Sequence, residues 1–224
     1  MSALREQLRF EVRMFYDLQR LRLQAGGRIQ ARATEIHLSD KDQERIAGIA
    51  EALNGLERAQ LLTVNKLLKA FPIWDGFLKG VKGIGPTMGG VILAEYDISI
   101  AENVSKMWRF GGLAVNSDGT AEKRKKGEKL AYNSFLKSKL LGVLGPSFLK
   151  CSSPYRDFYD NYKHRLISKE WGKSDGHRHN ASIRYMVKMF IKDLYVEWRT
   201  IEGLTVRPPY AEEYLGKVHA TAEE

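Results

Sequence analysis

The sequence is poor in cysteine and proline and has no long apolar run. Among its 224 residues are six prolines and one cysteine, Cys151. A lone cysteine excludes an internal disulfide and is typical of a reducing compartment. No apolar run approaches the length of a membrane span, and the charged start with Arg5, Glu6 and Arg9 lacks the apolar core of a signal peptide. The sequence therefore predicts a cytoplasmic protein without a membrane partner.

Acidic residues are outnumbered by basic ones. The chain carries 36 lysines and arginines against 27 aspartates and glutamates, which gives a formal net charge of +9 and an isoelectric point near 9.5. This excess suits a polyanionic partner, and nucleic acid is the commonest of these. A basic surface can also serve solubility alone, so the charge favours nucleic acid only in combination with a binding motif.

Alternation of apolar and polar residues is also missing, so no segment predicts a sheet. A hydrophobic fraction of 43% is nevertheless enough for a core. Apolar residues recur instead at three- and four-residue spacing, which is typical of amphipathic helices. The sequence therefore predicts an all-α fold in three parts: an antiparallel helical hairpin over residues 1–71, a helical DNA-binding domain over 72–202 and an extended tail over 203–224.

The first part is predicted to form two long helices, over residues 3–36 and 40–70. Ser39 and Asp42 resemble a capping box at the start of the second helix. Coiled-coil spacing with one slip follows there. It is formed by Ile46, Ile49, Leu53, Leu56, Leu61, Val64, Leu68 and Phe71. The apolar edge that such a hairpin leaves over would form a homodimer or higher oligomer, or pack on the rest of the chain.

Arginines follow the first helix at steps of four and seven residues. Arg5, Arg9, Arg13 and Arg20 therefore share one helix face. Such a face is either solvated surface or a contact for phosphates. We weigh the two interpretations equally, because few acids offset the arginines up to Arg32.

The most informative motif lies in residues 77–96, FLKGVKGIGPTMGGVILAEY. Its turn, Gly83-Ile84-Gly85-Pro86, separates two apolar stripes of helical spacing. Glycine allows positive φ and leaves backbone amides bare, and proline suits the first position of a new helix. Donors at a helix N-terminus form a site for a phosphate oxygen. The pattern predicts a helix-hairpin-helix, although a plain turn with glycines for packing remains the alternative.

Basic residues flank the turn of this motif, and glycines follow the turn. Lys79 and Lys82 lie beside the turn, while Gly89 and Gly90 would let two helix axes approach closely. A loop over residues 114–127 adds a run of four basic residues. The candidate DNA-binding residues are Lys79, Lys82, Gly83, Ile84, Gly85, Thr87, Lys106, Arg109, Lys123, Arg124, Lys125, Lys126, Lys129, Arg5, Arg9 and Arg13.

Further helices are predicted over residues 104–110, 130–144, 154–166 and 180–201, with a break at Gly145-Pro146 and a loop over 172–179. The helix over 154–166 carries Tyr155, Phe158, Tyr159 and Tyr162. Core packing is the favoured interpretation of these aromatics, whereas exposure beside Arg156, Lys163 and Arg165 would favour single-stranded nucleic acid. His177 and His179 lack further ligands at zinc spacing, so we expect neither a metal nor another cofactor.

Residues 41–200 resemble the C-terminal half of the Piv/MooV DNA invertases and the related bridge-RNA-guided insertion-sequence transposases. The matching pieces, in order, are the coiled-coil helix ending in FP, GIGPTMGGVILAEYDIS, WRFGGLAV, KRKKGEKLAYNSFLKSKL, YRDFYDNYKHRL and HNASIRYMVKMFIKDLY. The resemblance implies DNA as a partner, with RNA as an open alternative. It also implies a nucleophilic serine, which matches Ser117, with Thr120 as a second choice.

The resemblance does not extend to the acidic, metal-binding RuvC-like domain of that family, whose βαβ pattern this sequence lacks. A serine nucleophile needs such a metal or base. We therefore expect a non-catalytic protein of a phage or mobile element that grips single-stranded, duplex or branched DNA in replication, transcription or recombination. The alternatives are a recombinase subunit, which would form a covalent DNA adduct lost in Ser117→Ala, and a helical scaffold for a protein partner.

Overall fold

The computed structural model describes residues 2–33, 39–115, 121, 127, 130–172 and 174–215. Within these residues the regular structure is helical, and the one β contact is an isolated bridge between Val115 and Ala121. The predicted all-α class is confirmed. The chain divides into two compact units, Met1–Phe71 and Pro72–Glu224. No helix in the described part is long and apolar enough to cross a membrane.

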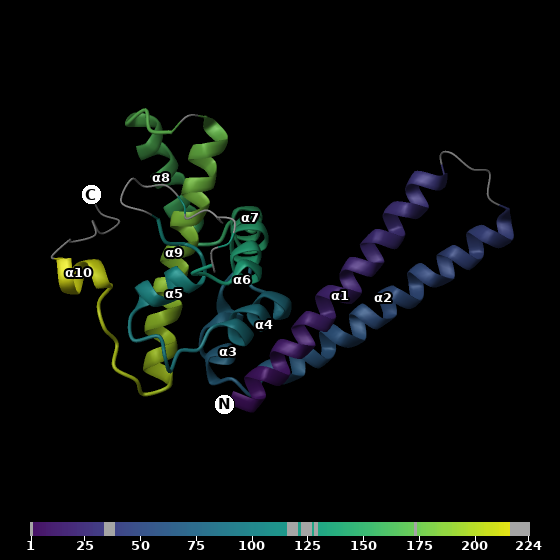
Figure 1. Ribbon diagram of the computed structural model, residues 1–224, viewed down its shortest axis with the longest axis horizontal. Coiled ribbons are helices and arrows are strands. Elements are labelled where there is room, and N and C mark those ends of the chain that lie inside the picture. The colour runs from purple at the N-terminus through teal and green to yellow at the C-terminus, as the bar shows by residue number, and fades with distance from the viewer. Residues whose placement is uncertain are drawn as a thin grey trace. The chain divides into compact units, whose positions relative to one another are not determined.

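The first unit consists of α1 (Ser2–Ala33) and α2 (Asp40–Leu68), which lie side by side and antiparallel (Figure 1). The predicted cap of α2 is confirmed. The Ser39 hydroxyl accepts a hydrogen bond from the Asp42 N–H at 3.3 Å and donates to the Asp42 carboxylate at 2.7 Å. This reciprocal bonding satisfies a donor that the first turn of a helix otherwise leaves without a partner.

Polar contacts fix the pairing of α1 with α2. Gln60 donates to the backbone oxygen of Glu11 at 3.0 Å, and Gln19 donates to the Glu57 carboxylate at 3.1 Å. Arg22 forms an ion pair with Glu57, which is 9% exposed. The hydrogen bond from Arg22 lowers the pKa of Glu57. Residues later in α1 contact residues earlier in α2, so these contacts define an antiparallel register.

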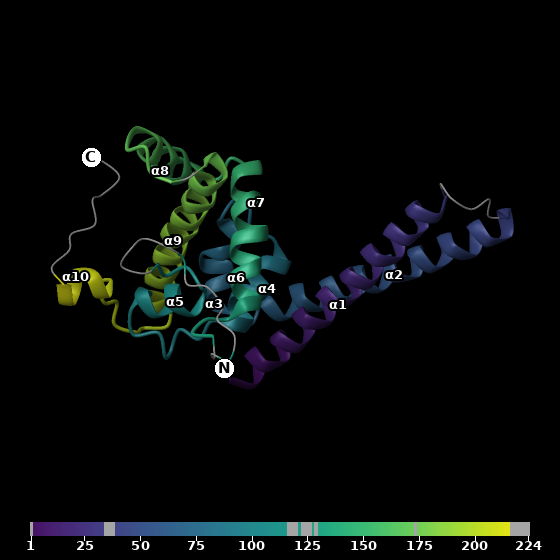
Figure 2. The same cartoon turned by 45° about the horizontal axis from the view of Figure 1, so that its top comes forward.

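The second unit contains the remaining helices. They are α3 (Pro72–Gly76), the 3₁₀ turn η1 (Leu78–Gly80), α4 (Pro86–Glu95), α5 (Val104–Phe110), α6 (Ser134–Lys139), the π turn η2 (Leu140–Leu144), α7 (Gly145–Lys150), α8 (Arg156–Ser168), α9 (Asp175–Ile201) and α10 (Tyr210–Leu215). The helix α9 is central to this unit, since α3, α5, α7, η2 and α8 all contact it. Figures 1 and 2 show α8 beside the N-terminal half of α9.

Side chains of α9 bind the loop between α4 and α5. The Tyr195 hydroxyl donates to the backbone oxygen of Glu102 at 2.7 Å. The buried Arg199 donates to the oxygens of Ile98 and Ala101 at 3.2 and 2.8 Å. A buried guanidinium is tolerated here because backbone carbonyls satisfy its donors.

The predicted break at Gly145-Pro146 is wrong, because α6, η2 and α7 continue as one helical segment (Figure 2). The Gly145 N–H bonds to the oxygen of Leu140, five residues earlier, which widens the helix into a π turn. A wider turn relieves the clash between a proline ring and the preceding turn. Gly145 also lies close to α9, where a Cβ would stand 2.7 Å from Ile183 Cγ2.

Among the other boundaries that differ from the prediction, two show why. The helix α9 begins at Asp175 and not at residue 180, because the Ser174 hydroxyl accepts the His177 N–H at 3.2 Å and so caps it. The tail is not extended throughout, since it forms α10, and Arg207 pairs with Glu213 at 2.7 Å. The serine cap was readable in the sequence, whereas α10 is too short to show a periodic pattern.

Candidate nucleic-acid interface

The turn between η1 and α4, residues 81–85, is here called the glycine turn. Gly83 takes a φ of +102°, a conformation that favours glycine. The Ile84 N–H bonds to the oxygen of Val81 at 3.0 Å, and the Ser147 hydroxyl of α7 donates to the oxygen of Gly83 at 2.8 Å. The turn is therefore held both by its own backbone and by α7.

Packing beneath the turn explains its glycines. A Cβ on Gly89 would lie 2.4 Å from Cζ3 of the buried Trp74, so this glycine makes room for the indole ring of α3. A Cβ on Gly83 would lie 2.9 Å from Cδ1 of Phe148. The side chain of Ile84 is 8% exposed. One side of the turn is thus fastened to the core.

The other side of the turn is open. Gly85 is exposed, and no heavy atom lies within 4 Å of a Cβ built on it. It precedes Pro86 at the start of α4, where no side chain caps the helix. Thr87 is half-buried in the first turn of α4. The first N–H groups of α4 carry the positive end of the helix dipole toward this open side.

Two lysines flank the glycine turn. Lys79 is exposed and pairs with Asp75 at 3.1 Å, which offsets part of its charge. Lys82 is exposed, and it forms no ion pair with any residue that the structure describes. Among the described residues, Lys82 is therefore the cation beside the glycine turn that is available to a phosphate.

The remaining predicted cations of the described chain lie on α5 and α1. Lys106 pairs with Glu102 at 2.7 Å, and Arg109 is exposed near the end of α5. On α1, Arg5, Arg9 and Arg13 are half-buried. Carboxylates offset more of the positive charge of α1 than the spacing of its arginines in the sequence indicated. Arg9 bonds to Glu6 at 2.5 Å, Arg20 pairs with Asp17 at 2.9 Å, and Arg22 pairs with Glu57.

Six predicted site residues fall outside the described residues. They are Ser117, Lys123, Arg124, Lys125, Lys126 and Lys129, and the second serine-like candidate, Thr120, lies outside as well. The two histidines considered as metal ligands have aromatic partners: His179 Nδ1 is 2.6 Å from the Tyr159 hydroxyl, and His177 packs on Trp171. Within the described chain no three metal-binding side chains gather.

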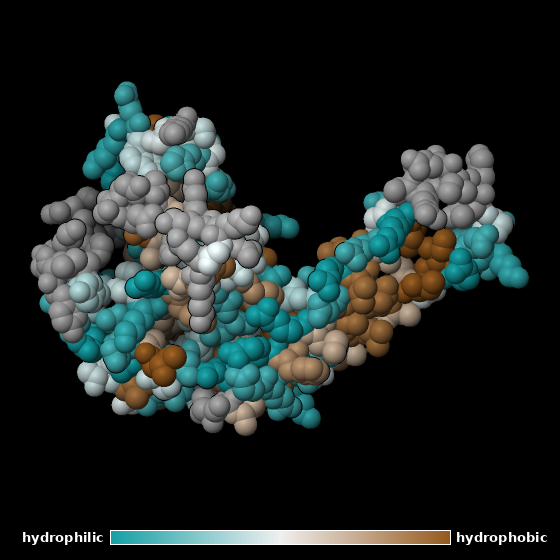
Figure 3. Space-filling model, in the orientation of Figure 1, coloured by the Kyte–Doolittle hydropathy of each residue, from teal (hydrophilic) through white to brown (hydrophobic). Residues whose placement is uncertain are grey.

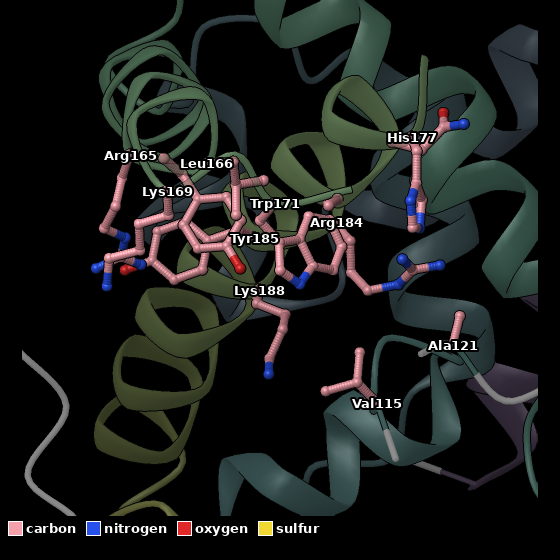
Figure 4. A pocket seen from close by; sticks show the side chains of 13 residues that line it. Val115, Ala121, Arg165, Leu166, Lys169, Trp171, His177, Arg184, Tyr185 and Lys188 are labelled. Carbon is pink, nitrogen blue, oxygen red and sulfur yellow. The ribbon is translucent and has the colours of Figure 1, made fainter. Parts of the chain in front are cut away.

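A cavity of about 830 Å³ opens beside α8 and α9 (Figure 4). We call it the stacked cavity, after the aromatic pairs in its wall. Tyr162 of α8 and Tyr185 of α9 are stacked with ring centroids 4.3 Å apart and planes at 13°. The guanidinium of Arg165 lies 4.8 Å from the centre of the Tyr162 ring. Trp171 lies with its ring centroid 4.8 Å from that of His177.

Cations complete the wall, and none of the 13 described residues that line it carries a carboxylate. Arg165 and Lys169 come from the end of α8, and Arg184 and Lys188 from α9. Burial lowers the pKa of Arg184. Burial, and next the positive charge of Arg184, lower the pKa of Lys188. The charge in this cavity therefore costs free energy that a bound anion would offset.

The end of α8 places Trp171 in the wall. The Trp171 N–H bonds to the oxygen of Leu166 at 2.9 Å, and the Glu170 N–H bonds to that of Ile167 at 2.9 Å. This is the Schellman arrangement. It requires positive φ at Glu170, which is 49° although the residue is not glycine. The chain thereby reverses and brings Trp171 back beside Leu166.

The sequence did not predict this cavity. It did predict that Tyr162 would favour single-stranded nucleic acid if it were exposed beside Arg165. Tyr162 is half-buried and lies beneath Arg165, which partly meets that condition. The signal was in the spacing. On α9, Ala181, Arg184, Tyr185 and Lys188 share one face, and on α8 Tyr162, Arg165, Leu166 and Lys169 do the same. Aromatic and basic residues that share one face of each helix indicate a wall rather than a core.

A scan of family models and a search of curated proteins both found no match to this chain.

Proposed function

We propose that this protein binds DNA through its sugar-phosphate backbone, without catalysis and with little sequence preference. The observation that carries the proposal is the open side of the glycine turn. There the uncapped start of α4 and the exposed Lys82 adjoin Gly85, and a Cβ built on Gly85 would meet no heavy atom within 4 Å. Backbone N–H groups and lysine suit phosphate oxygens, and such contacts carry no base information.

Rigidity supports the same function. The turn is bonded to Ser147, and Gly83 packs on Phe148, so the donors of α4 are held in place before a ligand arrives. Preorganised donors lose little conformational freedom on binding. The chain's net charge of +9 adds long-range attraction to any polyanion. The resemblance to the DNA-binding half of the invertases and transposases named above agrees with this assignment, and it favours an origin in a phage or mobile element.

A mobility-shift series tests the proposal. Single-stranded, duplex and four-way DNA are each titrated at two salt concentrations with the wild type, Lys82→Glu and the control Lys192→Glu. Lys192 is exposed on α9 and lines neither the glycine turn nor the stacked cavity. We expect Lys82→Glu to weaken binding several-fold, and binding to fall steeply with salt. An equal effect of the two substitutions, or affinity that ignores salt, would contradict the proposal.

A homodimer formed by the first unit is part of the proposal. Large apolar side chains remain exposed on α1 and α2, and Figure 3 shows hydrophobic residues gathered along this hairpin. They are Phe10, Met14, Leu21, Leu23, Ile49, Leu56 and Leu62. Clustered apolar surface of this kind is typical of protein interfaces. Light scattering at micromolar concentration should give twice the chain mass of 25.5 kDa, whereas a monomeric mass would remove the dimer.

A further inference from the structure

We propose that the stacked cavity holds one unpaired nucleotide of the bound strand, with its base against the aromatic wall and its phosphate at Arg184 and Lys188. This inference rests on the proposed function for the identity of the polymer. It goes beyond that function because it assigns a second site, with a preference for strands whose bases are free.

The size of the cavity fits a small ligand. Its volume of about 830 Å³ lies within the roughly 300–1,000 Å³ range of ligand pockets. Its wall combines aromatic and aliphatic side chains with a few convergent polar groups, which is typical of such pockets. Leu166 is buried and adds an apolar side chain to the wall of the cavity.

The positive charge of the cavity favours an anionic ligand. Arg184 and Lys188 are one helical turn apart on α9, and Figure 4 shows their side chains leaving the helix in different directions, with Val115 opposite the space between them. Neither forms an ion pair with a carboxylate in the described chain, and Nε of Arg184 is buried without a hydrogen-bond partner there. The ammonium of Lys188 lies 4.4 Å from the centre of the Trp108 ring. A phosphate would satisfy donors that the fold leaves open.

The aromatic side chains of the wall indicate which chemical group the ligand carries beside its phosphate. The rings of Trp171 and His177 lie 4.8 Å apart with their planes at 31°, and Tyr162 and Tyr185 are stacked on each other with Arg165 against the Tyr162 ring. A flat base can stack on such groups in any sequence. A base inside a duplex is already stacked on both faces, so it must leave the helix before it can enter. An acidic peptide would pair with the cations but offers no flat base to stack beside the aromatic rings.

Fluorescence anisotropy with the full chain tests the inference. The probes are an oligothymidylate, an abasic strand of equal length and charge, and a blunt duplex. We expect the wild type to bind oligothymidylate about tenfold more tightly than the abasic strand, as stacking of one base would give. Trp171→Leu should abolish this preference, and Arg184→Gln should weaken binding to oligothymidylate and the abasic strand alike. Duplex binding should stay within about twofold in both variants.

The outcomes separate this inference from the proposed function. Equal wild-type affinity for the thymidylate and abasic strands, or a preference that survives Trp171→Leu, would overturn the nucleotide site. Lys82→Glu reports on the glycine turn alone and should weaken duplex binding while the preference for bases remains. An oligouridylate that binds far more tightly than oligothymidylate would overturn the assignment to DNA. Thermal unfolding of Arg184→Gln at a temperature no lower than that of the wild type shows that the loss is one of binding, and Lys192→Gln serves as the charge-matched control.

Discussion

The glycine turn and the stacked cavity both belong to the second unit, yet they present positive charge in opposite ways. At the glycine turn, Lys82 is exposed and the start of α4 faces solvent, while Gly83 packs closely on the core. In the cavity, Arg184 and Lys188 are partly buried among aromatic rings, and burial lowers the pKa of each. Solvent and salt screen the exposed charge at the turn strongly, and they screen the partly buried charges in the cavity much less. An exposed site can bind the phosphate backbone despite such screening, whereas a site that selects bases must enclose the base between side chains.

The two glycines that bracket the start of α4 give the largest expected contrast. Gly89→Ala should lower the free energy of unfolding by about 1–3 kcal/mol, because its Cβ would overlap the ring of Trp74. Gly85→Ala meets no atom within 4 Å and should change it by less than about 0.5 kcal/mol. Urea denaturation measures both. Equal losses would mean that the open side of the turn is not open.

Salt distinguishes the two regions next. Lys82→Gln should reduce the slope of log affinity against log salt by about 0.7–0.9, the loss of one phosphate contact. Arg184→Gln should weaken binding to a single strand at both low and high salt, because its charge is partly buried and less screened. Titrations at several salt concentrations measure these slopes. If the contribution of Arg184 vanished at high salt, the cavity would be an ordinary exposed patch.

The pKa of Lys188 predicts a smaller effect, on stability. Burial first, and then repulsion from Arg184, hold this pKa below its ordinary value of 10.5. Below the folded-state pKa the buried charge costs stability. Between that pKa and 10.5 the unfolded state binds more protons, so stability rises with pH through this window.

Lys188→Met should therefore unfold at a slightly higher temperature than the wild type at neutral pH, and the difference should shrink as the solution becomes alkaline. Its affinity for oligothymidylate should fall. Thermal scans at neutral and alkaline pH, with parallel binding titrations, measure both effects. A variant that is less stable at neutral pH would show that the cation–π contact with Trp108 outweighs the cost of burial.

The smallest effect concerns the residue that turns Trp171 into the cavity. Glu170 has a φ of 49°, which is strained for a residue with a Cβ. Glu170→Gly should raise the free energy of unfolding by less than about 1 kcal/mol, since glycine relieves the strain but gains freedom in the unfolded chain. Urea denaturation measures it. Destabilisation by this change would indicate that the Glu170 side chain makes a contribution of its own.

Much of the fold was predictable because it depends on local signals. The bounds of α5 were predicted without error, since Gly111-Gly112 ends a short apolar pattern, and the Ser39 cap marked the start of α2. The continuous helix through Pro146 was not predictable. It needs a π turn, which has no clear local signature, and a close contact with Ile183 from a distant part of the chain.

The candidate sites divide in the same way. The glycine turn could be found from sequence because its glycines, proline and lysines are consecutive. Its anchoring by Ser147 and Phe148 could not, because those residues lie more than sixty positions away. The stacked cavity draws its two walls from separate helices, α8 and α9, and only their packing brings Tyr162 against Tyr185.

By itself the sequence determined the helical class, the basic character and the glycine turn, because helix periodicity, charge and turn chemistry act between near neighbours. The tertiary structure decided which cations remain available. Ion pairing offsets Lys79 and Lys106, while packing leaves Arg184 and Lys188 half-buried without a described carboxylate partner. Whether a charge is offset or buried depends on residues distant in sequence, and no local pattern encodes that.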